Sequence, residues 1–385
     1  MDPSVIDLVE TNGQLTFTIS NINVSFANGL RRVILSDIPT VIIRTSPHEK
    51  NDVDLQINTT ILNNEIIKQR LSCIPIYISD TSINISDYVI EVHVKNTSEQ
   101  TQYVTTKDFK IKNITTNKYL NDEITQTIFP PNSISKQYID VCRLRPQISD
   151  NFNGDELKFT AKLSLGTANE NGSFTVVSTC SYSNTLDVFK IAEQKEIKIN
   201  KLREQNITEE QIVTEIKDWE NLDAKRIYIE DSFSYTIKSI GVFTNNDIVL
   251  KAIKITIERL QNIIDIYSKS NSLITETNGT INNSYDIKLE NEDYTIGKIL
   301  EYTLYINHYK GDNTINFCGF NKPHPHVPYS IIRLGFNEDI DKNRVAAYIV
   351  NSAEIAIKVY EKLLPNFGEL TPTEKIAINK SMPTV

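Results

Sequence analysis

Two stretches of the chain, related by an offset of 270 residues, carry the same pattern. The segment "LTFTISNINVSFANGLRRVIL" at 15–35 aligns without a gap with "YDIKLENEDYTIGKILEYTLY" at 285–305. In each, apolar residues first alternate with polar ones and then recur at helical spacing, which predicts a half-buried strand followed directly by an amphipathic helix. The chain is therefore predicted to contain two copies of one strand–helix unit.

A second pair of segments extends this repeat. "YTIKSIG" at 235–241 and "YSIIRLG" at 329–335 share their aromatic, hydroxyl and glycine positions, and each precedes a long amphipathic helix. The helix stripes consist of Val249, Ile253, Ile257, Leu260 and Ile264 in the first case, and of Val345, Ile349, Ser352, Ala356, Val359 and Leu363 in the second. We predict an α+β fold in which two strand–helix dimerisation units form an intramolecular pseudo-dimer. A chance likeness of two generic amphipathic units is the alternative.

The first helix of the repeat is predicted to end at Pro39, because proline cannot continue a helix. Ser25 is the candidate residue to cap its amino end. Gly29 lies within the helix, where glycine costs about 1 kcal/mol relative to alanine. Its presence predicts close packing of another element at that position.

The two copies differ in what interrupts them. Roughly two hundred residues separate helix and strand in the first copy, which is enough for a domain of its own. The predicted organisation is a discontinuous first dimerisation domain (1–40 and 185–267), an inserted mostly β domain (41–184), a linker (268–284), a second dimerisation domain (285–365) and a tail (366–385).

The inserted region shows the alternation typical of strands at 88–95, 155–166 and 173–183. One helix, "NEIIKQRLS" at 64–72, is expected within it. The charged segment 192–228 is predicted to form an exposed connecting helix.

Composition excludes several classes of protein. The chain has 385 residues, with 40 basic and 49 acidic side chains and a net charge of −9, which argues against a stand-alone nucleic-acid binder. It contains no long apolar run and its first residues do not resemble a signal peptide, so an intracellular location is expected. The cysteines are scattered without a CxxC pair, so neither a zinc site nor a disulfide framework is predicted; they are Cys73, Cys142, Cys180 and Cys318.

Four segments together resemble a known family. "FANGLRRVILSDIPTVII" at 26–43 is similar to the signature helix of the platform subunit of multisubunit RNA polymerases. That family comprises the third-largest subunit of eukaryotic RNA polymerase II, its archaeal equivalent and the amino-terminal domain of bacterial alpha. "NTTILNNEIIKQRLSCIPI", "CRLRPQ" with "DELKFTAKLSLGTA", and "DSFSYTIKSIGVFTNNDIVLKAIKI" resemble its later motifs in the same order.

The last hundred residues resemble the smaller partner of that platform subunit, which is the eleventh subunit of RNA polymerase II or its archaeal equivalent. "ENEDYTIGKILEYTL" and "FCGFNKPHPHVPYSIIRLG" carry the likeness. Both subunits in one polypeptide resemble the fused subunit of large cytoplasmic DNA viruses, which implies a virion and host-cytoplasm (viral factory) location.

The resemblance implies a non-catalytic assembly platform that nucleates association of the two largest polymerase subunits. It also implies contacts with small polymerase subunits, DNA reached only through the complex, no membrane partner, and no homodimer because the two halves pair within the chain. The residues that it places at the large-subunit interface are Asn28, Leu30, Arg31, Arg32, Glu65 and Arg70. Those expected at the intramolecular dimer interface are Phe26, Val33, Ile253, Ile257, Leu260, Ile296, Leu300, Ile349 and Ala356.

Two observations qualify these assignments. Arg31 and Arg32 have no counterpart in the second copy, where Glu301 and Tyr302 stand, so the arginine pair is predicted to be a surface of the first copy alone. For Glu65 and Arg70, an ordinary intrahelical ion pair or local caps remain the alternative.

No catalytic constellation is visible. Nucleotide polymerisation needs clustered carboxylates that hold two metal ions, and the nearest acidic group, "ENED" at 290–293, lies at a predicted helix start, where acids favour the helix dipole. His324 and His326 offer only two metal ligands. We therefore predict no catalytic residue, no metal and no cofactor in this chain, so any enzymatic role is that of a component of a nucleotidyltransferase complex. The alternative function is a free-standing regulatory or adaptor protein with the same fold.

Overall fold

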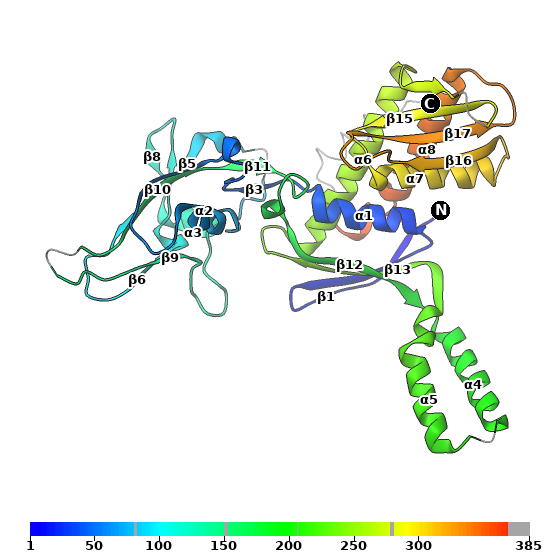
Figure 1. Ribbon diagram of the computed structural model, residues 1–385, viewed down its shortest axis with the longest axis horizontal. Helices are drawn as coiled ribbons and strands as arrows, with labels where there is room; N and C mark the ends of the chain where they lie inside the picture. Colours follow the sequence, from blue (N-terminus) through cyan, green and yellow to red (C-terminus); the bar gives the residue numbers. More distant parts are fainter. Residues whose placement is uncertain (81–82, 150–152, 206, 278–280, 369–385) are drawn as a thin grey trace. The chain divides into compact units, whose positions relative to one another are not determined.

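The computed structural model describes residues 1–80, 83–149, 153–205, 207–277 and 281–368 (Figure 1). The chain forms two compact units. The first comprises Met1–Val33, Thr179–Lys238 and Asn245–Val385, and the second comprises Ile34–Ser178 and Ser239–Thr244.

The first unit contains two four-stranded sheets. One has the order β1 (Ser4–Thr11), β2 (Gln14–Ser20), β13 (Tyr228–Ser239) and β12 (Val177–Leu186). The other has the order β14 (Ile274–Glu276), β15 (Ser284–Glu290), β17 (Tyr329–Phe336) and β16 (Ile315–Asn321). Taken in chain order, β1, β2, β12 and β13 occupy the same positions in their sheet as β14, β15, β16 and β17 occupy in the other. Both ends of β2 and β15 are related by the 270-residue offset.

Four helices lie between these sheets (Figure 1). They are α1 (Val24–Ser36), α6 (Asn245–Lys269), α7 (Tyr294–Leu304, continued by a π-helical turn at Tyr305–Tyr309) and α8 (Lys342–Glu361). Helix α8 packs against both α6 and α7. We call β1, β2, β12, β13, α1 and α6 the amino-terminal copy, and β14 to β17 with α7 and α8 the carboxy-terminal copy.

The turn between strand and helix is built alike in the two copies. Asn21 and Asn291 both adopt the left-handed conformation, with φ of 60° and 56°, which asparagine tolerates better than most residues. Two residues later, the side chain of Asn23 accepts a hydrogen bond from the Ser25 amide at 2.9 Å, as Asp293 does from the Thr295 amide at 2.8 Å. The prediction that Ser25 caps α1 was wrong, because the helix already begins at Val24 and Asn23 supplies the capping oxygen.

The close packing predicted at Gly29 is confirmed. A Cβ atom at this position would lie 2.8 Å from Cδ1 of Ile299 and 3.1 Å from Oη of Tyr360. Both distances are shorter than ordinary van der Waals contact, so a Cβ on residue 29 would force the tips of the Ile299 and Tyr360 side chains to shift.

The second unit is the mostly β domain. Its larger sheet has the order β4 (Val53–Asn58), β10 (Glu156–Lys162), β5 (Tyr88–Lys95), β7 (Lys110–Asn113) and β8 (Lys118–Tyr119). Two-stranded sheets pair β11 (Ser164–Gly166) with β3 (Thr40–Ile42), and β6 (Gln102–Thr105) with β9 (Asp140–Leu144). Helix α2 (Asn64–Ser72) has the predicted bounds and buries Ile67 and Leu71 in the same core as Phe109 and Phe159.

The second unit also contains α3 (Asp122–Ile128), a helix that the sequence pattern did not predict. It has only seven residues, which is too short for a helical periodicity to show. The unit begins at Ile34 and its main segment ends at Ser178, compared with the expected 41–184.

The charged segment expected as one connecting helix forms two. Helices α4 (Val188–Glu204) and α5 (Glu209–Asn221) pack side by side as a hairpin between β12 and β13 (Figure 1). A new helix starts after Thr208 because Glu209 and Glu210 provide the acidic first turn that favours a helix amino terminus.

The segment expected as a linker, 268–284, contains parts of three elements. Helix α6 continues to Lys269, and β14 pairs with β15. Within it, 278–280 lie outside the described residues, as do 369–385 of the expected tail.

Candidate functional site

Helix α1 carries the arginine pair that the sequence singled out, and its two members have different environments. Arg32 donates from Nη2 to Oδ2 of Asp293 at 2.6 Å and from Nε to Oγ1 of Thr295 at 2.8 Å. These acceptors lie at the start of α7, so Arg32 joins the amino-terminal copy to the carboxy-terminal copy. The side chains of Arg32 and Asp293 are 37% and 39% exposed, so solvent weakens their ion pair.

Asp293 keeps its charge in this setting. Burial raises the pKa of its carboxyl group, but hydrogen bonds from the amide and hydroxyl of Thr295 and the positive charges of Arg32 and Arg259 outweigh that effect. The resulting pKa lies below the usual value for aspartate. The carboxylate is therefore ionised at neutral pH and is available to Arg32.

Arg31 is oriented by its own helix. Its Nε and Nη2 donate to Oδ1 of Asn28 at 3.1 and 2.9 Å. Among the residues that the structure describes, Arg31 contacts no carboxylate. Its half-exposed guanidinium group therefore carries an unneutralised charge on α1, whereas Leu30 beside it is fully buried and contributes only to packing.

In the second unit, the two polar residues predicted for α2 do not pair with each other. Arg70 donates to the backbone oxygens of Val141 at 2.7 Å and Asp140 at 2.8 Å, and thereby ties α2 to β9. Glu65 is exposed in the first turn of α2. No ion pair joins Glu65 and Arg70, so the alternative of an intrahelical pair has no support in this part of the described chain.

The residues predicted for the intramolecular dimer interface are almost all in the core. Eight are fully buried, namely Phe26, Val33, Ile253, Leu260, Ile296, Leu300, Ile349 and Ala356. Ile257 is only half-buried, and Thr256 and Ile263 take the buried positions beside it on α6. The sequence stripe missed Thr256 because its hydroxyl group looks polar, but that group is satisfied within the helix by the Ala252 carbonyl oxygen at 2.8 Å.

Two further contacts between the copies were not predicted. Tyr360 of α8 donates from Oη to the carbonyl oxygen of Phe26 in α1 at 2.9 Å. Arg259 of α6 binds Glu292 with Nε to Oε1 at 3.2 Å. The sequence contains no local signal for either contact, because the partners of each lie far apart along the chain. The partner of Tyr360 is moreover a backbone oxygen.

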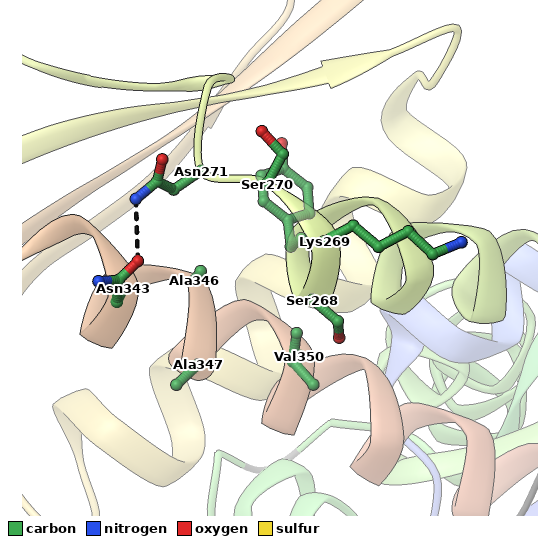
Figure 2. Close-up of a pocket in the computed structure, with 9 residues that line it drawn as sticks. Ser268, Lys269, Ser270, Asn271, Asn343, Ala346, Ala347 and Val350 are labelled. Atoms are coloured by element: carbon green, nitrogen blue, oxygen red, sulfur yellow. Dashed lines mark hydrogen bonds between the residues drawn. The ribbon is translucent and has the colours of Figure 1, made fainter.

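A hollow of about 560 Å³ opens between the end of α6 and the start of α8 (Figure 2). Its lining includes Lys269 between Ser268 and Ser270, and the Asn271 amide donates to Oδ1 of Asn343 at 2.9 Å across it. No histidine or carboxylate lines it, and within the described residues Lys269 makes no hydrogen bond to either serine, so its lining does not favour catalysis.

The potential metal ligands of the chain are dispersed. No group of three His, Cys, Asp or Glu side chains gathers in the described ranges, and the rings of His324 and His326 are 4.9 Å apart without a third ligand. Asp293 of the "ENED" segment caps α7, as the helix-start interpretation predicts, and Glu292 and Asp293 also bind arginines. Over the same ranges, no helix is long and apolar enough to cross a membrane.

Comparison with known proteins identifies the family. Residues 16–260 match the family model described as the RNA polymerase Rpb3/Rpb11 dimerisation domain. The chain is 23% identical over 290 residues to DNA-directed RNA polymerases IV and V subunit 3B of Arabidopsis thaliana, an alignment that covers 64% of this chain and 86% of that protein.

Two further relatives come from other lineages. DNA-directed RNA polymerase II subunit rpb3 of Dictyostelium discoideum is 24% identical over 294 residues, covering 66% of this chain and 90% of the relative. DNA-directed RNA polymerase subunit Rpo3 of Methanosarcina acetivorans is 34% identical over 76 residues, covering 20% and 25% of the two chains. The family match ends before the second sheet.

Proposed function

Because the chain belongs to the RNA polymerase Rpb3/Rpb11 dimerisation-domain family, we propose that it is a non-catalytic assembly subunit of a DNA-directed RNA polymerase. The observation that carries this proposal is the family match, which spans 16–260 and so covers the inserted domain and most of the amino-terminal copy, from within β2 to within α6. Relatives aligned over most of their own length are polymerase subunits.

The carboxy-terminal copy extends the proposal to a fused subunit. Its sheet has the same strand order as the amino-terminal sheet, and its helices α7 and α8 pack in one compact unit with α6. This arrangement supports an intramolecular pseudo-dimer, in which the carboxy-terminal copy takes the part that the smaller partner subunit plays in the family. From the resemblance to the fused subunit of large cytoplasmic DNA viruses, we further propose that this subunit acts in the host cytoplasm (viral factory) and is carried in the virion.

The role within the complex is to hold the two largest subunits together. The half-exposed Arg31, oriented by Asn28 and without a carboxylate partner among the described residues, supports an acidic docking partner on α1. Exposed Glu65 on α2 is a second candidate contact on the other unit. Arg32 and Leu30 are less suited to this task, because the first binds Asp293 and the second is buried.

The experiment is affinity purification of the tagged full chain from its native source. We expect two very large proteins, one of which carries the Asp-x-Asp-x-Asp run of catalytic polymerase subunits, to co-purify in equal amounts. The test variant Arg31→Ala should recover less of the large subunits than the original chain, while the variant itself stays folded. Recovery of the chain without either large subunit would contradict the proposal and favour the free-standing adaptor.

A further inference from the structure

The 270-residue offset that relates the two copies in sequence also relates residues that touch. Gly29 and Ile299 hold equivalent positions in the repeat, and Cδ1 of Ile299 lies 2.8 Å from where a Cβ on Gly29 would be. In a two-fold arrangement, a residue meets its own equivalent only near the axis. Gly29 and Ile299 therefore mark the axis of the pseudo-dimer, on whose proposal this inference rests.

A symmetric dimer makes each contact away from its axis twice, once on either side. Here one polar contact is found on one side and, within the described residues, is absent from the equivalent position on the other. Arg32 binds Asp293 on one side. The equivalent positions on the other side are Tyr302 and Asn23, and there the ring of Tyr302 packs edge-on against Phe26 with centroids 6.3 Å apart. Asn23 and Asp293 cap their helices in the same way, so they differ mainly in charge.

Self-pairing, in which two amino-terminal copies or two carboxy-terminal copies associate, would lose both the Gly29–Ile299 fit and the Arg32–Asp293 ion pair. Two amino-terminal copies would place Gly29 opposite Gly29, which leaves empty the space that Ile299 fills, and each Arg32 would face the neutral Asn23. Two carboxy-terminal copies would force two Ile299 side chains into the space of one, and each Asp293 would face Tyr302 without a cation. Only the mixed pair is both filled and charge-matched.

We propose that the Gly29–Ile299 contact and the Arg32–Asp293 ion pair select pairing of the amino-terminal copy with a carboxy-terminal copy and disfavour self-pairing of either. The fit of a side chain into a glycine gap provides steric selection, and the Arg32–Asp293 ion pair provides electrostatic selection. Together they allow one chain to close on itself instead of joining a second chain.

The test removes the covalent tether, which by itself raises the local concentration of the mixed pair. A protease site is placed at 270–272 of the full chain, between α6 and β14, where Ser270 and Ser272 are exposed, so that the cut separates the two copies. The folded protein is cut, and the fragments are unfolded, refolded together and weighed by native mass spectrometry. We expect the unmodified sequence to return as one-to-one mixed pairs. Abundant self-pairs of either fragment from this sequence would overturn the proposal.

A combined variant should reverse the selection. Asn23→Asp with Asp293→Asn moves the carboxylate to the amino-terminal copy while both helix caps and the net charge are kept. Gly29→Ala with Ile299→Ala makes the axis equally small on both sides. Relative to the control Asp293→Asn, the four substitutions should raise amino-terminal self-pairs by about tenfold or more. Mixed pairs alone, as in the control, would overturn the proposal.

A second measurement on the uncut chain covers the case in which fragments do not refold. Gly29→Leu should lower the thermal midpoint by several degrees through overpacking, and adding Ile299→Ala should restore at least about half of that loss. Absence of any rescue would show that residues 29 and 299 do not form a complementary pair. The proposal on pairing is tested by fragment mass and thermal midpoint, whereas the proposed polymerase function is tested by co-purification of the large subunits. Either proposal can therefore fail while the other stands.

Discussion

The hydroxyl group of Tyr360 in the last long helix donates a hydrogen bond of 2.9 Å to the carbonyl oxygen of Phe26 in the first, 334 positions earlier in the chain. Both residues are fully buried. The bond links α8 to α1 beside Gly29, where a Cβ would crowd Ile299 of the other copy. A helix carbonyl oxygen is thus engaged by a residue from the opposite end of the protein.

Tyr360→Phe should lower the free energy of unfolding by about 1–2 kcal/mol, because the carbonyl oxygen of Phe26 loses a buried partner. Urea unfolding monitored by circular dichroism measures this loss. Tyr235→Phe is the matched control, since its hydroxyl group bonds the Ala27 carbonyl oxygen at 2.6 Å within the amino-terminal copy. Only Tyr360→Phe should also speed hydrogen exchange where α1 meets α8, and equal exchange in the two variants would contradict a role between the copies.

Substitution of the two arginines of α1 should separate stability from assembly. Arg32→Ala should cost roughly 0.5–1 kcal/mol of stability, a modest loss because solvent screens its half-exposed ion pair. Arg31→Ala should leave stability within about 0.5 kcal/mol of the original, since among the described residues its side chain bonds only Asn28. Urea unfolding checks both values. The opposite order of the two losses would assign Arg31 the structural role.

Stability should depend on pH through Asp293. Its native pKa lies below the value of 3.8 for an unperturbed aspartate, so the native state keeps this carboxylate ionised to lower pH than the unfolded chain does. The stabilisation is complete well above pH 3.8 and is lost as the pH falls through the native pKa. Asp293→Asn, which keeps a capping oxygen, should therefore be less stable than the original at pH 7.

The comparison across pH provides the check. The difference in unfolding free energy between the original chain and Asp293→Asn should shrink as the pH falls below about 4, because the unfolded original chain then binds a proton that its native state does not yet bind. Below the native pKa both variants lack the charge. Urea titrations from pH 3 to 7 measure it. A difference that stays constant over this range would show that Asp293→Asn lowers stability for a reason other than the lost charge.

The α4–α5 hairpin should be dispensable for folding. Helix α4 buries no side chain, and α5 buries only Ile212 and Ile216. The two ends of the hairpin are already adjacent, since the amide of Asp187 bonds the carbonyl oxygen of Ile227 at 3.2 Å. Replacing 188–226 with a short glycine-containing turn should change the unfolding free energy of the rest of the chain by no more than about 1 kcal/mol. Loss of the native circular dichroism signal would show that the hairpin supports the sheet.

The repeat could be predicted from the sequence because its signals are local. Alternating apolar residues define β2 and β15. Asparagine at 21 and 291 fits the left-handed turn that follows each strand. The apolar stripe of α1 contains a glycine that already indicated a close neighbour. The bounds of α2 were predicted from an equally local signal, the apolar residues on one side of the segment ahead of Pro75.

The sequence alone could not identify the neighbour of each polar group. Arg31 and Arg32 are consecutive arginines of one helix, yet successive residues of a helix point about 100° apart, so only the packing of α7 determined that Arg32 binds Asp293 and Arg31 does not. The partners of Arg70 and Tyr360 are backbone oxygens, which are the same in every residue and leave no sequence signal. Sequence thus determined the elements and their buried faces through local periodicity, whereas tertiary structure decided the pairings, because they depend on which distant atoms packing brings within hydrogen-bond reach.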